Sequence, residues 1–299
     1  MAFVYGIFIF IFICVVCYRV FDESTSMNRI YNNMLSMITT IPQSATVNTL
    51  KPGVICCLTR GYTNINRYSK LISRNNHLSK LQWASKYDHK IFHEGNIPQN
   101  HQQYILDQTS LPIEFVNIEH VFKRPSRKIP TDAECRRDSD WPEGYKRMCR
   151  FWFVDFWEYI KEYEYMIRFD EDVLVDEECK DPIEYAKLNN VHYLSPYLMG
   201  EPYEVIDGLD KLTGIPYEDM HNVPSTHTQL IHVPHYMDKP AVREFIDLID
   251  SSGCILYNRW GDAPLMGILI RKFTKDFEYE FEWKGFKGYH GSHDSFFLN

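Results

Sequence analysis

Short apolar runs alternate with stretches of helical spacing along most of this chain. Compact apolar runs predict buried strands at residues 54–58, 87–92 and 113–117, and another that ends just before residue 170. Apolar positions at helical spacing predict helices over residues 64–72, 99–108, 144–159, 238–250 and 263–273. Strands that alternate with helices through short loops favour an α/β sandwich with a largely parallel sheet flanked by helices.

Polar side chains follow two of the predicted strands. Thr59 and Arg60 come directly after the first strand, and the acidic run Asp170, Glu171 and Asp172 comes after the fourth. In open α/β sheets, ligands bind beyond the carboxyl ends of the strands. We therefore expect these two loops to contribute to one ligand-binding site. For an enzyme that transfers a group from a donor substrate, Thr59 and Arg60 are expected on the side of the donor.

The acidic run has the spacing of a metal site. In an extended chain, side chains two residues apart point to the same side, so Asp170 and Asp172 are expected to face one hard divalent cation. Nucleotide-sugar transferases use such a DxD motif. The alternative is a solvated turn, because short acidic clusters are common on protein surfaces.

Composition limits the classes of function. With 299 residues, 44% of them hydrophobic and 15% aromatic, the chain can bury a substantial core. Its formal charge of −8 argues against nucleic acid as a partner, because a phosphate backbone requires a basic surface.

The first twenty residues predict a membrane anchor. Residues 3–18 carry no charge and are mostly apolar, and such a segment can cross a thin endomembrane. A cleaved signal peptide is the alternative, although no basic segment precedes it. We expect an anchor over residues 1–20, a polar stem over 21–51 and a catalytic domain over 52–299. The six cysteines beyond the anchor show no CxxC spacing, which disfavours zinc; their even number permits disulfides in a luminal domain.

Four motifs occur in a recognisable order: Gly-Tyr-Lys-Arg-Met-Cys-Arg-Phe at 144–151, Arg-Phe-Asp-Glu-Asp-Val at 168–173, Arg-Trp-Gly-Asp-Ala-Pro at 259–264 and Gly-Tyr-His at 288–290. Together they span most of residues 54–293, and the chain resembles a divergent member of the fungal α-1,2-mannosyltransferase family. The resemblance implies a GT-A fold (a Rossmann-like sandwich), a GDP-sugar donor, a divalent metal (usually manganese), retention of anomeric configuration and a type II membrane topology.

The resemblance also implies roles for individual residues. Asp170 and Asp172 match the acidic pair of the metal motif, and His290 matches the histidine that completes the metal site; His293 is a nearby alternative. Tyr145 matches a tyrosine near the reaction centre, and Asp262 matches the aspartate of the Trp-Gly-Asp-Ala-Pro motif.

The chain departs from the family at two positions. Glu171 replaces a proline, which predicts a more acidic and more flexible loop. Gln229 aligns with a proposed nucleophilic glutamate, and an amide cannot form the glycosyl ester of a double displacement. For Gln229 the alternative is a side chain that lines the pocket or faces the core.

Several candidates have a structural alternative. Arg150 either stabilises the donor diphosphate or pairs with Glu158 or Asp155. Trp260 either packs on a sugar or belongs to the core. Asp262 suits the N-cap of the helix that follows, and Tyr145 either positions the acceptor or is simply buried.

The leading hypothesis is a membrane-anchored, metal-dependent, retaining glycosyltransferase facing the lumen of a Golgi-like compartment. Its donor would be GDP-mannose before other nucleotide-sugars, its cofactor Mn²⁺ or Mg²⁺, and its acceptor a glycan or glycoprotein. Gln229 motivates the alternative of a catalytically silent glycan- or nucleotide-sugar-binding homologue. A metal-dependent nucleotidyltransferase fits the acidic run but not the Trp-Gly-Asp-Ala-Pro motif.

Overall fold

The computed structural model describes residues 49–137, 140–291 and 295–297. The expected anchor, the stem up to residue 48 and His293 lie outside these residues. Within the described ranges, none of the helices is long and apolar enough to cross a membrane. The proposed boundaries at residues 20 and 51 stay a prediction.

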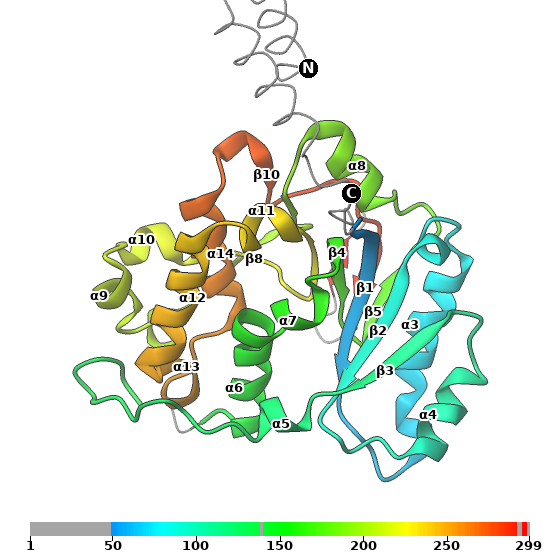
Figure 1. Ribbon diagram of the computed structural model, residues 1–299, viewed down its shortest axis with the longest axis horizontal. Helices are drawn as coiled ribbons and strands as arrows, with labels where there is room; N and C mark the ends of the chain where they lie inside the picture. The colour runs from blue at the N-terminus through cyan, green and yellow to red at the C-terminus, as the bar shows by residue number, and fades with distance from the viewer. Residues whose placement is uncertain (1–48, 138–139, 292–294, 298–299) are drawn as a thin grey trace, which may run out of the picture. The chain divides into compact units, whose positions relative to one another are not determined.

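A seven-stranded mixed sheet forms the centre of the fold, in the order β10-β6-β9-β4-β1-β2-β3 (Figure 1). Its strands are β1 (Lys51–Thr59), β2 (Asp88–His93), β3 (Ile113–Asn117), β4 (Tyr163–Phe169), β6 (Tyr193–Leu194), β9 (Thr228–His232) and β10 (Tyr279–Glu280). Only β9 runs against its neighbours among these described strands. The predicted α/β sandwich with a mostly parallel sheet is confirmed.

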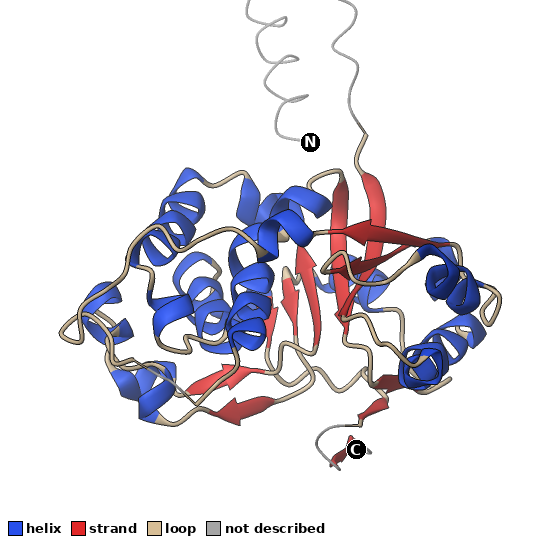
Figure 2. Cartoon of the chain, turned by 90° about the horizontal axis from the view of Figure 1, so that it is seen from below, coloured by secondary structure: helices blue, strands red, loops and turns tan. Residues whose placement is uncertain are grey.

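Helices cover both faces of the sheet (Figure 2). One group begins with the short turn η1 (Ile65–Tyr68) and comprises α3 (Ser69–Lys80), α4 (Gln99–Leu106) and α8 (Pro182–Asn189). The other comprises α5 (Glu119–Phe122), α6 (Glu143–Arg150), α7 (Trp157–Ile160), α9 (Leu209–Thr213), α10 (Tyr217–Met220), α11 (Val233–Met237), α12 (Pro240–Ser252), α13 (Cys254–Tyr257) and α14 (Asp262–Phe273). The helix expected over 144–159 is α6 and α7 joined by a π-helical turn, η3 (Phe151–Asp155).

The residues of β1 show why the sheet is buried on both sides. Val54 and Cys56 belong to the apolar cluster under α6, α12 and α14, whereas Ile55 and Cys57 belong to the clusters on the opposite face. Successive side chains of a strand point to opposite faces, so a strand covered on both sides requires an uninterrupted apolar run. This explains the compact run that marked the strand in the sequence.

Two small sheets complete the fold. β5 (Val173–Val175), β11 (Gly288–His290) and β12 (Ser295–Phe297) form one, with β11 antiparallel to both neighbours. β7 (Leu198–Gly200) and β8 (Asn222–Pro224) form the other. The first of these sheets brings the C-terminal Gly-Tyr-His motif beside the strand that follows the acidic run.

A disulfide joins Cys135, in the loop before α6, to Cys254 at the start of α13, a sequence separation of 119. Both cysteines are buried. The sequence permitted disulfides but did not identify this pair, because the partners belong to segments that only the fold brings together.

We expect the double substitution Cys135→Ser/Cys254→Ser to lower the free energy of unfolding by about 2–5 kcal/mol, since the bond closes a long loop in the unfolded chain. Urea unfolding with and without reductant measures this. Reductant should destabilise the native chain and leave the double variant unchanged, because the other described cysteines are buried free thiols in both. Equal stability of the two oxidised proteins would contradict the prediction.

Candidate active site

The acidic run forms a turn between β4 and β5. β4 ends at Phe169, the amide of Asp170 donates to the carbonyl of His227 at 3.0 Å, and the amide of Val173 donates to the carbonyl of Asp170 at 3.1 Å. The extended geometry expected for residues 170–172 is therefore wrong. The three acidic side chains instead have three different sets of partners.

Arg168, two residues before the turn, holds two of the site's carboxylates. Its Nε and Nη2 donate to the two oxygens of Asp170 at 2.7 and 3.1 Å, and its Nη1 donates to Asp262 Oδ2 at 2.6 Å. The guanidinium also lies 4.2 Å from the centre of the Trp152 ring. Arg168 is 3% exposed; burial opposes its charge, but the two carboxylates outweigh burial and raise its pKa.

Asp262 does not cap the helix that follows. α14 begins at Asp262 itself, and Gly261 occupies the N-cap position without a side-chain hydrogen bond. The carboxylate of Asp262 accepts from Arg168 instead, so the N-cap interpretation is wrong. Its negative charge still lies in the first turn of α14, where the helix dipole favours it.

Asp172 and His290 meet across the small sheet. His290 lies opposite Val173 in the β11–β5 pairing, and the amide of Gly291 donates to the carbonyl of Asp172 at 2.9 Å. This pairing places His290 Nε2 3.2 Å from Asp172 Oδ1, with both side chains largely buried. A groove of about 290 Å³ opens beside Asp172, between α3 and β11.

His227 supports this pair from β9's side of the site. Its ring stacks on that of His290 with centroids 3.9 Å apart and planes 7° apart, and its Nδ1 lies 2.9 Å from Ser225 Oγ. His227 was not among the predicted site residues, since it precedes a strand without any motif.

Glu171 joins the acidic turn to the end of β1. It accepts from the hydroxyl of Thr59 and, at 3.0 Å, from that of Tyr62. The guanidinium of Arg60 lies 5.3 Å from the Tyr62 ring centre. The predicted meeting of the first loop with the acidic run is therefore confirmed, whereas the expected flexibility of the turn is not supported, because Glu171 is anchored by two hydroxyl groups.

Arg259, the first residue of the Arg-Trp-Gly-Asp-Ala-Pro motif, lies next to Tyr145, although the sequence analysis did not assign it a role in the site. The guanidinium of Arg259 lies 3.8 Å from the Trp141 ring centre and 5.4 Å from that of Tyr145. Burial, Cys149 and Asp262 raise the pKa of Tyr145, and burial raises that of Glu201, with Arg259 opposing. Tyr145 therefore lies close enough to Asp262 and Arg259 for both charges to act on its hydroxyl group.

Gln229 lies beside the buried arginine. It is directly opposite Arg168 in the β4–β9 register, is 2% exposed and accepts at Oε1 from the hydroxyl of Tyr193 at 2.9 Å. Its Nε2 has no hydrogen-bond partner among the described residues. The side chain is therefore buried beside the site, as its structural alternative proposed, with one amide donor left unsatisfied at a cost in free energy.

Two predicted donor-binding residues have structural partners. The buried Arg150 donates to Asp250 at 2.7 Å and to Asp155 at 3.0 Å. The contact with Asp155 is one of the two ion pairs that the structural alternative proposed. Trp260 is 1% exposed and donates to the carbonyl of Asp207 at 3.0 Å. The structure thus favours a structural role over donor binding for both, since neither side chain is available to a ligand.

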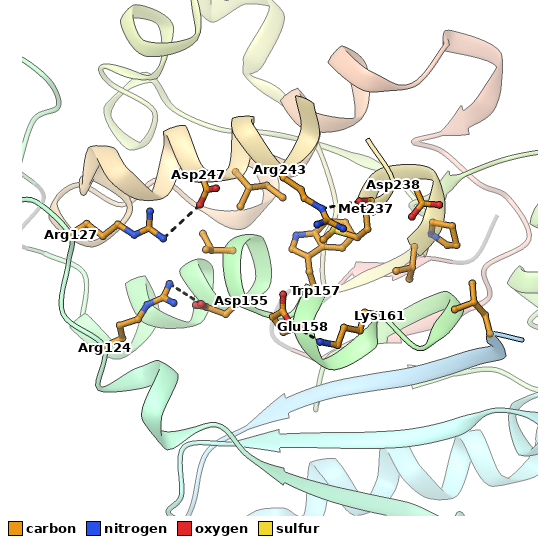
Figure 3. Close-up of a pocket in the computed structure, with 15 residues that line it drawn as sticks. Arg124, Arg127, Asp155, Trp157, Glu158, Lys161, Met237, Asp238, Arg243 and Asp247 are labelled. Carbon is orange, nitrogen blue, oxygen red and sulfur yellow. Dashed lines mark hydrogen bonds and ion pairs between the residues drawn. The ribbon is translucent and has the colours of Figure 1, made fainter. Parts of the chain in front are cut away.

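A groove of about 530 Å³ lies elsewhere, between α7, α11 and α12 (Figure 3). Three of its four cations have acidic partners: Arg124 with Asp155 at 2.9 Å, Arg127 with Asp247 at 3.6 Å and Lys161 with Glu158 at 3.0 Å. The fourth, Arg243, donates to the carbonyl of Met237 at 3.0 Å. None of the residues of the acidic turn lines it. We therefore place the candidate site at the turn.

The composition of the turn fits a hard divalent cation. Carboxylate oxygens with one imidazole nitrogen suit Mn²⁺, and oxygen ligands alone suit Mg²⁺. Asp170 and Asp262 share the guanidinium of Arg168, whereas Glu171 accepts from hydroxyl groups and Asp172 meets His290. The carboxylates of Asp170 and Asp172 with the imidazole of His290 therefore make up the donor set for such a cation.

Comparison with known proteins was made by sequence and by fold. No family model matches the chain. Curated relatives are the probable mannosyltransferase KTR3 of Saccharomyces cerevisiae (29% identity over 161 residues, 46% of this chain) and the O-glycoside alpha-1,2-mannosyltransferase omh1 of Schizosaccharomyces pombe (27% over 158 residues, 44% of this chain). A third is the glycolipid 2-alpha-mannosyltransferase of S. cerevisiae (26% over 180 residues, 52% of this chain). The match spans 40% of the length of each relative.

Solved structures share the fold. The mannosyltransferase Ktr4p of S. cerevisiae superposes with a TM-score of 0.66 at 15% identity, over 83% of this chain and 72% of that one. Core-mannan synthase A of Aspergillus fumigatus, in an Mn/GDP form, superposes with a TM-score of 0.64 at 16% identity, over 83% and 76%. The architecture is thus the GT-A fold of these enzymes.

We expect Arg168→Met to lower the free energy of unfolding by about 3–5 kcal/mol, because it leaves Asp170 and Asp262 buried without their cation. Urea unfolding measures the loss. Adding Asp170→Asn and Asp262→Asn should recover part of it, since the uncompensated charges are then removed. Lys161→Met, which breaks an exposed ion pair, should cost less than about 1 kcal/mol; a similar loss in both single variants would contradict the account.

Proposed function

We propose that this chain, a divergent relative of the fungal α-1,2-mannosyltransferases, is a metal-dependent glycosyltransferase. It transfers a sugar to a glycan or glycoprotein with retention of configuration. The preferred donor is GDP-mannose, which supplies mannose. The observation that carries the proposal is the pairing of Asp172 with His290 beside the Arg168-held carboxylates, at the carboxyl end of the parallel strands. The names of the sequence relatives and the Mn/GDP form of core-mannan synthase A support it.

Asp170, Asp172 and His290 would hold the metal. The ion, when bound, supplies positive charge opposite a leaving diphosphate. The protein's part is to prepare its ligands: Arg168 fixes both oxygens of Asp170, and His227 fixes the ring plane of His290. A ligand already held in place loses little conformational entropy on binding.

Thr59, Arg60 and Arg259 are the proposed contacts to the donor. Thr59 lies at the end of β1 and reaches the turn through Glu171. Arg60 and Arg259 stand over aromatic rings, which hold their guanidinium groups in place. Guanidinium groups pair well with phosphate oxygens, so they provide positive charge that Arg150, held in its buried ion pairs, does not.

Gln229 bears on the mechanism of retention. An amide cannot act as the nucleophile of a double displacement, so we propose a front-face transfer in which the leaving phosphate accepts the proton of the attacking hydroxyl. Tyr193 occupies one lone pair of Gln229 Oε1. Because Gln229 is buried, its remaining lone pair would stabilise positive charge on a neighbouring sugar through the amide dipole and not through direct contact.

We also propose an anchored, lumen-facing protein. The uncharged segment at residues 3–18 supports the anchor. The disulfide between Cys135 and Cys254 supports an oxidising compartment, because such bonds rarely persist in a reducing cytosol.

A silent binding homologue is the second candidate, favoured by Gln229 alone. It would bind a nucleoside diphosphate sugar with a metal but would neither hydrolyse nor transfer it. A panel of GDP-, UDP- and ADP-sugars with Mn²⁺ or Mg²⁺, assayed on the full chain for donor hydrolysis, separates the two candidates. Faster hydrolysis of GDP-mannose than of the other donors supports the proposed function. Binding of a nucleotide-sugar without hydrolysis supports the silent homologue.

We expect chelation of divalent metal to abolish turnover, and Asp172→Asn to lower kcat by about 100- to 1000-fold, the scale of a lost electrostatic contribution in an active site. His290→Ala should act in the same direction with a smaller loss, because water can replace one ligand. Glu177→Gln removes a neighbouring carboxylate that is exposed and serves as the matched control. Full activity in excess EDTA would overturn the metal assignment.

We expect Gln229→Ala to lower the rate by about 10- to 1000-fold, or about 1.4–4 kcal/mol of barrier, and Gln229→Glu to remain active. Proton NMR of the anomeric coupling in the product tests the stereochemistry. A retained linkage in both proteins agrees with front-face transfer. An inverted linkage would mean that a carboxylate such as Asp262 acts as a general base.

A further inference from the structure

Three histidines gather at the sheet edge opposite the acidic turn. His192 precedes β6, His232 ends β9, and His235 lies in the first turn of α11. One ring nitrogen from each lies within 4.8 Å of the other two. His232 pairs with Tyr165 at the start of β4. Asp170 is five positions further along the chain, which at a rise of ~3.3 Å per strand residue is a distance of about 17 Å.

We propose that His192, His232 and His235 form a second metal site, for a borderline transition-metal ion such as Zn²⁺. Nothing in the proposed transfer reaction uses these residues. Imidazole nitrogens suit zinc, copper and nickel, whereas the carboxylate-rich turn suits harder ions. The two sites therefore differ in the ions that they select.

The geometry is close to that of a ligand set. His192 Nδ1 and His232 Nδ1 lie 2.9 Å apart, and two nitrogens bound to one tetrahedral zinc at about 2.0–2.1 Å lie about 3.3 Å apart. The rings of His192 and His235 stack at 3.8 Å. Because imidazole lone pairs lie in the ring plane, metal binding requires these rings to rotate out of the stack and direct their nitrogens at one ion.

The charged side chains around the three rings tolerate a cation. The charged side chains that act on the cluster are three acids and two bases: Glu164, Asp238, Glu278, Lys187 and Lys239. The acids outnumber the bases, which favours an added positive charge.

Lys239 competes with the metal. Its Nζ lies 2.8 Å from His235 Nε2 and donates to the carbonyl of Phe273 at 2.7 Å. A metal ion must displace or repel this ammonium group. Bound zinc would tie β6, β9 and α11 together at the sheet edge, a structural role distinct from transfer.

The test uses the full chain carrying Asp172→Ala and His290→Ala, which removes two of the three proposed ligands of the acidic turn, including its only imidazole. Co²⁺ as a probe should give the intense visible absorption of a tetrahedral site, and added Zn²⁺ should quench it and raise the unfolding temperature. Absence of both signals would overturn the proposal without any substitution in the cluster.

The substitution His232→Ala in the same background should weaken Co²⁺ binding by about 100-fold or more. Loss of a residue that only supports a ligand typically weakens metal binding by about 10- to 100-fold. Lys239→Met should tighten it, because the competing charge is lost. Unchanged affinity in the His232 variant would also overturn the proposal. These measurements need no turnover, so their failure and a failure of the transferase proposal are distinguishable.

Discussion

The contact between Arg168 and two carboxylates determines the geometry of the candidate site. Its guanidinium binds both oxygens of Asp170 and one of Asp262, and so joins the end of β4 to the start of α14. A buried arginine is tolerated only when its donors are satisfied, and the Trp152 face covers what the carboxylates leave. With Asp170 held in this way, the chain turns at the sheet edge and presents Asp172 to His290.

The remaining contacts of the turn come from three other segments of the fold. Thr59 and Tyr62, at and after the end of β1, hold Glu171. His227, just before β9, stacks on His290 of β11. Each segment reaches the turn because the parallel strands end on one side of the sheet and the antiparallel strand β9 begins there. The result is a preorganised set of carboxylate and imidazole groups that would hold a divalent cation. A cation at this place would stabilise the leaving diphosphate of a nucleotide-sugar donor.

The sequence predicted the sheet and most helices, because apolar runs and helical spacing are local signals. It also predicted that Thr59 would meet the acidic run and, through the motifs, that His290 would meet Asp172. It did not identify the partners of the other charges. A lone arginine in a buried strand, Arg168, was the available signal, since such a group must have an acid nearby. The Cys135–Cys254 bond and the histidine cluster depend on contacts between distant segments, which local patterns do not specify.

The central claim is that Asp172 and His290 bind the metal used in transfer. Pulsed electron paramagnetic resonance of Mn²⁺ on the full chain, with ¹⁵N-labelled histidine, tests it most directly because the spectrum reports imidazole nitrogen bound to the ion. The account predicts a nitrogen coupling that disappears in His290→Ala and persists in His232→Ala. A coupling that survives His290→Ala, or bound manganese without any histidine coupling, would contradict the account.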